Sequence, residues 1–158
     1  MDYLGETCLA GEFDMENATM GRVVVSAKME NIADCVEVMQ GKKKPEDVRT
    51  LVIDDALVDT GATTVSMPKR FITQLGLIPF RDRPARTATG SVMVKVYGAV
   101  HLIVQGRECN CDVQEVADDC PVLIGQVPLE LLDFVVDPKG QQLIGNPLHG
   151  GQQMLELY

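Results

Sequence analysis

The stretch ALVDTGAT, residues 56–63, places an Asp-Thr-Gly tripeptide directly after a short apolar run, and this tripeptide occurs once in the chain. Residues 51–58 predict a β-strand that runs straight into Asp59, although two consecutive aspartates interrupt its apolar character. Gly61 would let the backbone approach the carboxylate closely. Because Asp and Gly are also common turn residues, the tripeptide alone fits an ordinary loop, and its context has to decide.

A second apolar run, PVLIG at residues 121–125, repeats the plan of the first. After the tripeptide, Pro68 opens a short helical stretch over residues 69–75, and a glycine follows it. Proline at the start and glycine past the end are typical of a helix. After the second run, Pro128 opens a helical stretch over residues 129–134. This weak internal duplication of strand, tight turn and proline-started helix is not expected of a chance turn.

Between the two runs, residues 86–91 form a small polar turn segment. Val92, Val94 and Val96 then alternate with other side chains, which is the period of a strand. The pattern predicts a β-hairpin with its tip near Gly90. On the pattern alone, an ordinary hairpin is the simpler interpretation.

Together these features resemble the retroviral-like aspartic proteases over roughly residues 23–147. The resemblance implies a mainly β, acid-protease (retropepsin-like) barrel subunit with two short helices. It implies a symmetric homodimer, since one chain gives one catalytic Asp, and an aspartic endopeptidase in which Asp59 of two subunits forms a dyad. The dyad would activate water and polarise the scissile carbonyl of a peptide or protein substrate. A strand-turn-strand pattern over residues 132–143 looks most like the bacterial and cellular single-domain members.

The same resemblance implies roles for the residues around Asp59. Thr60 and Gly61 would complete the catalytic loop, with Thr60 locking the turn across the two-fold axis. The substrate-binding residues would be Gly61, Ala62 and Thr63 along the cleft, Ala88, Thr89, Gly90 and Ser91 in a flap over it, and Ile124 and Gly125 in the wall behind the catalytic loop.

The chain departs from the family pattern where charges pair near the dimer interface. The retroviral enzymes carry a second Asp after Asp-Thr-Gly-Ala, and Arg-Asn after the later glycine. Here the positions hold Thr63, Gln126 and Val127. The charge network cannot form with these residues, so dimer support must come from elsewhere. Many relatives also carry Asp where Thr89 stands, so contacts at the flap tip would differ.

The alternative function is a catalytically weak or inactive dimeric module of the same fold that binds peptides or proteins, since a fold does not fix a function. Retention of the Asp-Thr-Gly tripeptide favours catalysis, because a binding module has no need of a buried carboxylate pair that is costly to desolvate. The sequence shows no glycine-rich phosphate loop and no convincing Ser or Cys triad.

The length of 158 residues suits one domain, and we expect a single aspartic-protease-like domain with an N-terminal extension over residues 1–20 and a C-terminal tail over residues 148–158. The chain is longer than a retroviral subunit, and part of its extra length lies in residues 31–50. There a lysine run before Pro45 predicts a solvated loop, interrupting a hairpin ahead of the catalytic strand. Residues 30–40 fit either a helix or a strand, and periodicity does not decide between them.

Charge and hydropathy bear on partners and location. The formal net charge of −9 argues against a nucleic-acid partner, because phosphate binding needs a basic face. No apolar run approaches the length of a membrane span. The N-terminus has neither the basic start nor the apolar centre of a signal peptide, so the sequence predicts a cytoplasmic protein.

We expect no metal or other cofactor, and the five cysteines are the residues to consider for a metal site. An odd number without a secretory signal favours reduced thiols. Cys109, Cys111 and Cys120 lack the spacing of a zinc site, and His101 and His149 are isolated.

Overall fold

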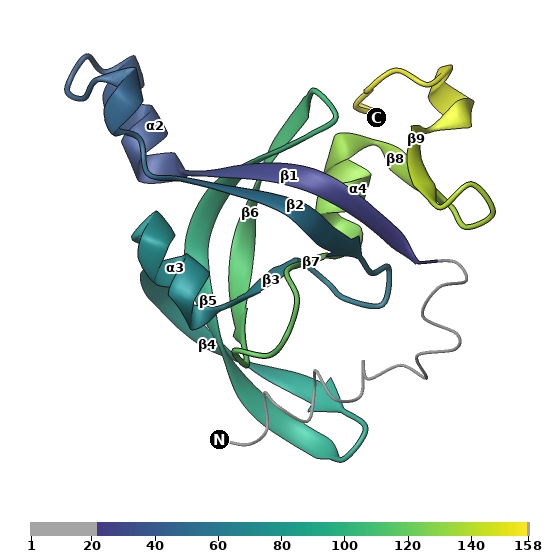
Figure 1. Ribbon diagram of the computed structural model, residues 1–158, viewed down its shortest axis with the longest axis horizontal. Helices are drawn as coiled ribbons and strands as arrows, with labels where there is room; N and C mark the ends of the chain where they lie inside the picture. Colours follow the sequence, from purple (N-terminus) through teal and green to yellow (C-terminus); the bar gives the residue numbers. More distant parts are fainter. Residues whose placement is uncertain (1–21, 158) are drawn as a thin grey trace.

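The structure is a computed structural model that describes residues 22–157, and these residues are mainly β (Figure 1). In chain order the elements are β1 (Val23–Asn31), α2 (Ile32–Met39), the 3-10 turn η1 (Pro45–Asp47), β2 (Thr50–Val58), β3 (Val65–Pro68), α3 (Lys69–Leu75), β4 (Ile78–Thr87), β5 (Gly90–Val104), β6 (Arg107–Val116), β7 (Leu123–Ile124), α4 (Gln126–Leu132), β8 (Phe134–Asp137), β9 (Gln142–Gly145) and the 3-10 turn η2 (Pro147–His149).

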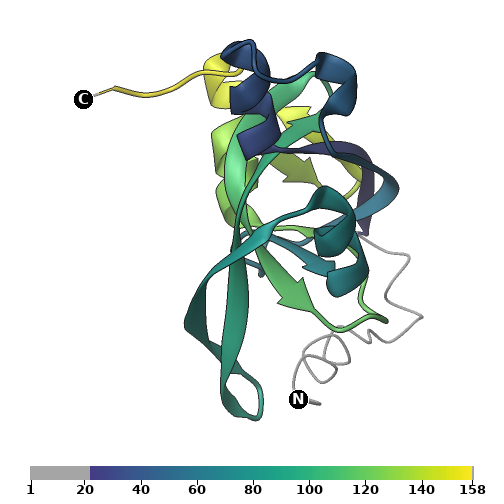
Figure 2. The ribbon, with the colours of Figure 1, turned by 90° about the vertical axis from the view of Figure 1, so that its left-hand side faces the viewer.

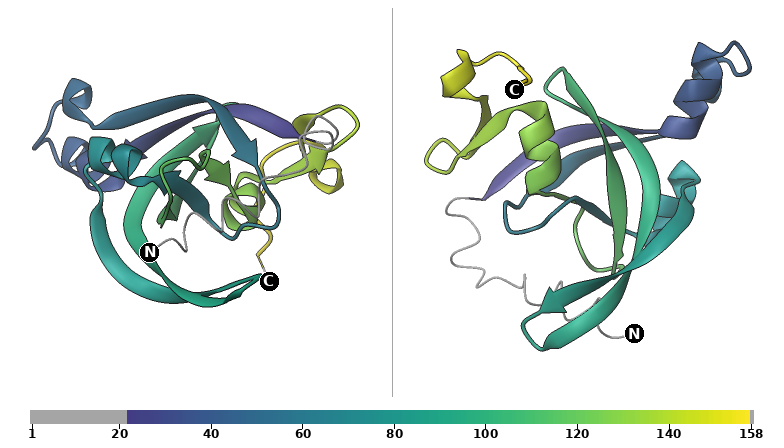
Figure 3. Two further views of the ribbon diagram at one scale, coloured as in Figure 1. Left: turned by 60° about the horizontal axis from the view of Figure 1, so that its bottom comes forward. Right: turned by 180° about the vertical axis from the view of Figure 1, so that it is seen from behind.

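The large sheet closes into a barrel. Its strand order is β1-β2-β7-β3-β6-β5-β4, and an additional antiparallel pairing joins β1 to β5. Closure uses the far half of β5, where Lys28 of β1 lies opposite Ile103. The near half of β5 pairs instead with β4, from Gly90 opposite Thr87 to Gly98 opposite Ile78. The β4–β5 hairpin therefore extends from the closed barrel, as the turned views show (Figures 2 and 3).

The barrel core follows from strict alternation of side chains along its strands. In β1, the side chains at every second position are buried, and those between them point to solvent over most of the strand. Helices α3 and α4 add Ile72, Leu75, Leu129 and Leu132 to the same cluster. The apolar side chains at 0% exposure are those of Met29, Ala56, Val65, Met67, Leu75, Val100, Leu102, Val113, Ile124 and Leu132.

Residues 30–40, which the sequence left undecided, end β1 and then form α2. Asn31 caps this helix, because its side chain accepts a hydrogen bond from Asp34 N at 3.1 Å. Asp34 is buried and accepts from Lys43 Nζ at 2.7 Å and from Arg49 Nε at 2.8 Å. The Arg49 guanidinium holds the pKa of Asp34 well below its usual range. These contacts pin the helix and its lysine loop between β1 and β2, which pair as the interrupted hairpin that was predicted.

The two predicted short helices are present as α3 and α4, and the described residues contain a third α-helix, α2, in the segment that the sequence left undecided. Helix α3 spans Lys69–Leu75 and ends at Gly76 in the left-handed conformation, as predicted. Helix α4 begins at Gln126 and ends before Asp133, earlier at both ends than the predicted 129–134. The strand-turn-strand pattern is confirmed as the β8–β9 pair, which begins only at Phe134.

Other sequence-based expectations have mixed outcomes. Cys35, Cys109 and Cys111 are free, but Cys120 takes part in a disulfide, so the expectation of a reduced thiol is wrong there. Cys8 and the N-terminal extension lie outside the described residues. Among residues 22–157, no helix combines the length and apolar character needed to cross a membrane.

Candidate functional site

Main-chain hydrogen bonds hold the Asp-Thr-Gly loop at the end of β2. Asp59 N donates to Ile124 O at 3.0 Å, and Ala62 N donates to Asp59 O at 3.1 Å. The carboxylate of Asp59 accepts from Gly61 N, with 2.9 Å between that nitrogen and Oδ1. Asp59 is half-buried, whereas Thr60 and Gly61 are exposed at the surface of the loop. The loop therefore presents one oriented carboxylate beside an exposed turn.

Strand β7 forms the wall behind this loop. It pairs in parallel with β2, with Leu57 opposite Leu123, and antiparallel with β3, with Val65 opposite Ile124. Leu57 N also donates to Val122 O at 2.9 Å. The second apolar run thus lies between the strands that enter and leave the Asp-Thr-Gly loop.

The start of α4 is bonded to the loop. Gln126 N donates to Ala62 O at 2.8 Å, and Val127 N donates to Thr63 O at 2.9 Å. The first N–H groups of a helix have no partner within the helix, so the loop carbonyls supply what a side-chain cap would otherwise provide. Because these carbonyls bind the N–H groups of residues 126 and 127, the helix begins before Pro128, which was expected to open it. The two carbonyls are distant in sequence, so a local pattern could not predict this start.

Gly125 permits the close contact between β7 and the loop. Its N–H donates to Thr64 O at 3.0 Å. A Cβ atom added at Gly125 would lie 2.6 Å from the main-chain oxygens of both Ala62 and Thr64. Any side chain at this position would therefore push the loop away from the wall.

Thr64 is a site residue that the sequence reasoning missed. Its side chain is buried, and its hydroxyl donates to Asp112 O on β6 at 2.6 Å. This bond ties the end of the loop to β6, the strand that pairs with β3. In the sequence, Thr64 directly follows the residues expected to line the cleft. Its hydrogen-bond partner lies on a strand that comes near only in the folded chain, so the sequence did not indicate this role.

The residues expected in a flap form the tip of the β4–β5 hairpin, and all of Ala88–Ser91 are exposed. Thr87 Oγ1 donates to Gly90 O at 3.0 Å and accepts from Thr89 N at 3.3 Å, which shapes the turn. Gly90 has φ +142°, a value that favours glycine. The loop after β2 and this tip lie on the same side of the barrel (Figure 1). The hydrogen bonds given above join the loop directly to Ile124 and Gly125.

A cavity of about 350 Å³ lies between the loop and the base of the hairpin. Thr63, Thr64 and Val127 line it from the side of the loop and α4, and Arg83 and Val96 line it from the hairpin. Arg83 was not among the predicted site residues. Its position opposite Val94 in the strand register places it on the same face of the hairpin as Val96, which lines the same cavity.

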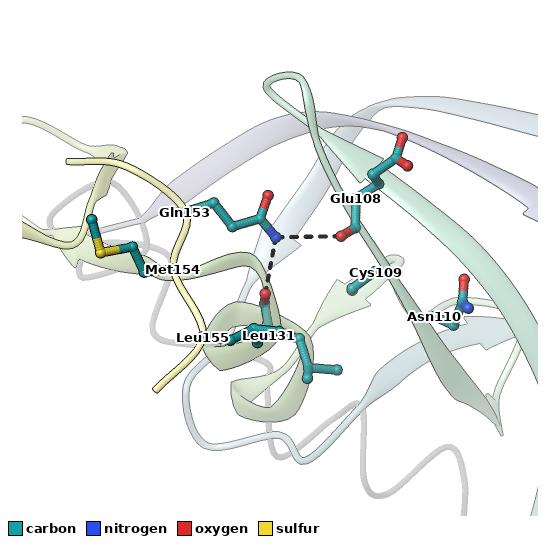
Figure 4. A pocket seen from close by; sticks show the side chains of 7 residues that line it. All are labelled: Glu108, Cys109, Asn110, Leu131, Gln153, Met154 and Leu155. Carbon is teal, nitrogen blue, oxygen red and sulfur yellow. Dashed lines mark hydrogen bonds between the residues drawn. The ribbon is translucent and has the colours of Figure 1, made fainter. Parts of the chain in front are cut away.

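A second cavity, of about 430 Å³, lies between β6, α4 and the C-terminal segment (Figure 4). Gln153 crosses its rim, because its side-chain nitrogen donates to Leu131 O at 3.1 Å and to Glu108 O at 3.4 Å. None of its lining residues belongs to the Asp-Thr-Gly loop or to the hairpin.

Asp133 anchors the C-terminal segment near this second cavity. Its carboxylate contacts His149 Nδ1 at 2.6 Å and accepts from Met154 N at 3.1 Å, while His149 Nε2 lies 2.9 Å from Glu156. The His149 contact lowers the pKa of Asp133 to about 2. The two carboxylates, Glu156 foremost, raise the pKa of His149. We call these four residues the C-terminal clasp.

Metal ligands do not gather in the described part of the chain. Among residues 22–157, no group of three or more His, Cys, Asp and Glu side chains is placed to hold a metal ion. The loop itself offers the carboxylate of Asp59, main-chain N–H groups and threonine hydroxyls.

The chain matches one family model and is similar to a solved viral protease. The model of the family described as gag-polyprotein putative aspartyl protease matches residues 53–140, more than half of the chain. Among solved structures, the chain is similar to the Simian Foamy Virus (mac) protease in its solution structure, with 21% identity over 69% of this chain and 93% of that one and a TM-score of 0.43. No curated protein matches the chain.

Proposed function

The chain belongs to the family of gag-polyprotein putative aspartyl proteases, and on this premise we propose that it is an aspartic endopeptidase whose active site forms between two copies of the chain. The observation that carries the proposal is the setting of Asp59. Its carboxylate is half-buried at the end of β2 and is oriented by Gly61 N at 2.9 Å. The loop from Asp59 to Thr64 holds no second carboxylate, so the same loop of a second copy supplies it.

Two carboxylates held close together cannot both ionise at neutral pH, so the pair keeps one proton. The ionised carboxylate takes a proton from water, and the water oxygen attacks the carbonyl carbon of the substrate. The protonated carboxyl gives its proton to the carbonyl oxygen. When the C–N bond breaks, a proton passes to the leaving nitrogen, and the pair again holds one proton. No step requires a metal.

The residues around Asp59 suit a peptide substrate. Thr60 is exposed at the turn, where a two-fold axis would bring it to its counterpart in the second copy. Gly61, Ala62 and Thr63 line the approach to the carboxylate, and Ala88, Thr89, Gly90 and Ser91 cover the bound chain from the hairpin. Ile124 and Gly125 fix the loop from behind through the hydrogen bonds described above.

The proposal is tested by comparing cleavage of a denatured proteome by the wild-type chain and by Asp59→Asn. The amide keeps the shape of the carboxylate but cannot act as a base, so we expect folding to persist and cleavage to cease. The matched control is Asp55→Asn, the same substitution at an exposed position of β2. It should cleave at the same sites as the wild type.

Cleavage that survives in a verified Asp59→Asn preparation would remove the proposed mechanism. A wild-type chain that binds peptides as a dimer but releases no new termini would instead identify a binding module of the same fold. The read-out is the set of new peptide termini, which also gives the residues preferred on each side of the cut bond.

A further inference from the structure

We propose, on the premise of the function above, that the 350 Å³ cavity beside the Asp-Thr-Gly loop is a substrate subsite for an acidic side chain, with Arg83 as its counter-charge. Its ligand is a glutamate or aspartate of the bound peptide. The family match and the Asp59 geometry say nothing of this preference, which rests on the β4–β5 hairpin.

The cavity joins the proposed catalytic loop to the hairpin. Thr63 and Val127 line one side of it, and Arg83 and Val96 line the other. Thr63 follows the Asp-Thr-Gly tripeptide by two positions, so a peptide lying across Asp59 reaches the cavity within a few residues of the scissile bond. A side chain of that peptide can then enter between the loop and the hairpin.

The strand register aims Arg83 at this cavity. Arg83 lies opposite Val94, whose side chain is buried at 7% exposure, and on the same face of the hairpin as Val96, which also lines the cavity. Arg86 lies three positions further along β4, opposite Ser91, and alternation along a strand places it on the other face. The two arginines therefore belong to the same hairpin but face different environments.

Arg83 lacks an internal partner. Among residues 22–157, no ion pair or hydrogen bond engages its side chain, which is exposed at the mouth of the cavity. A guanidinium offers a planar set of N–H donors that matches a carboxylate and can bind it through two parallel hydrogen bonds. An arginine without an internal partner, beside a cavity that Thr63 also lines, is thus suited to receive an acidic side chain.

The charge of the hairpin favours the same ligand. From residue 78 to residue 96 the hairpin carries Arg81, Arg83, Arg86 and Lys95 against Asp82 alone, in a chain whose formal net charge is −9. This local excess of positive charge attracts acidic segments of a substrate. One acid, Asp112 of β6, also lines the cavity, and it opposes an acidic ligand. Asp112 therefore provides a variant with an effect opposite in sign to that of Arg83.

The test uses peptides cleaved by the full-length chain, synthesised in sets that carry Glu, Gln or Lys at each position beside the scissile bond in turn. At one position we expect kcat/KM to be about tenfold higher with Glu than with Gln at low salt, the gain of a charge-assisted hydrogen bond. Arg83→Gln should bring that ratio close to one, Arg83→Glu should favour Lys instead, and Asp112→Asn should increase the ratio. Arg86→Gln, the matched control, should keep the ratio of the wild type.

Cleavage with equal kcat/KM for Glu and Gln at every position overturns the subsite and leaves the proposed function standing. So does a Glu preference that Arg83→Gln retains. A second arm measures binding of the same peptides to Asp59→Asn by fluorescence anisotropy, so that the subsite is tested separately from catalysis. If no peptide is cut, the proposed function fails. Glu-selective binding that Arg83→Gln removes still supports the subsite, and equal binding of Glu and Gln overturns it.

Discussion

Asp59 owes its position to main-chain groups. Its N–H bonds to Ile124 O, and its Oδ1 accepts from Gly61 N. Such partners do not depend on which side chains surround the loop, which is consistent with the exchange of charged family residues for Thr63, Gln126 and Val127 here. The constraint falls on glycines instead, because only a residue without a Cβ allows the backbone to pass so closely.

Gly125→Ala should therefore damage the site more than the fold. The new Cβ would meet the oxygens of Ala62 and Thr64 at 2.6 Å. We expect the free energy of unfolding to fall by about 1–3 kcal/mol from overpacking. Displacement of the loop should lower kcat/KM by about 100-fold. Denaturant unfolding and peptide cleavage measure the two effects. Gly98→Ala is the control, since its Cβ would meet Phe80 only at 3.9 Å, and wild-type activity in Gly125→Ala would contradict the constraint.

Residue 62 should set the alkaline limit of activity. Ala62 has no hydroxyl, whereas Ser at this position could donate to the Asp59 carboxylate. A hydrogen bond to the charged form lowers a pKa, so Ala62→Ser should make the pair lose its shared proton at lower pH. The alkaline limb of the bell-shaped pH profile of kcat/KM should move down.

Ala33→Ser, an exposed change on α2, serves as the control for this profile. An alkaline limb that stays in place or moves up in a folded Ala62→Ser protein would show that this account of residue 62 is wrong.

At the scale of elements, the sequence predicted the helices and strands whose bounds depend on residues close together in the chain. Helix α3 has its proline, its periodic apolar residues and its final glycine in one short segment, and its bounds agree with the prediction. The β4–β5 hairpin carries its alternation and turn residues together. Helix α4 was misplaced because its first N–H groups bond to loop carbonyls more than sixty residues away in sequence. Helix α2 was undecided because Asn31 ends a strand and caps a helix at once.

The C-terminal clasp should weaken as the pH rises through the raised pKa of His149. The pKa of His149 is raised by Glu156 and Asp133, so its contribution to stability is complete below its unfolded pKa of about 6.5 and is lost as the pH rises through the higher folded value. The pKa of Asp133 is lowered to about 2, so its contribution is present at neutral pH and is lost only as the pH falls toward that value.

The chemical shift of the Met154 amide proton reports this equilibrium, because that N–H donates to Asp133 at 3.1 Å. It should change as His149 deprotonates. His149→Gln should abolish the change, and His101→Gln should retain it. A Met154 shift that does not vary through this range in the wild type would contradict the clasp.

At the scale of the whole molecule, the barrel brings the Asp-Thr-Gly loop and the β4–β5 hairpin to one side (Figures 1 and 3). The sequence predicted a mainly β barrel through its family resemblance, but no local pattern predicts the β1–β5 pairing that closes it. That pairing joins residues about seventy positions apart, and it depends on the length of β5, which serves the barrel at one end and the hairpin at the other. The cavity beside Arg83 lies between the hairpin and the barrel, so it too depends on contacts between distant segments that the sequence did not predict.

The central claim is that each active site takes one Asp59 from each of two chains. Its most direct test is subunit mixing, in which wild-type chains exchange with an equal amount of Asp59→Asn chains before peptide cleavage is measured. Random pairing leaves about half of the wild-type chains in wild-type dimers, so activity per wild-type chain should fall to about half, and further with more variant. Mixing with Asp55→Asn should leave it unchanged. Activity per wild-type chain that stays constant at every ratio of exchanged Asp59→Asn chains would show that one chain suffices, and would contradict the claim.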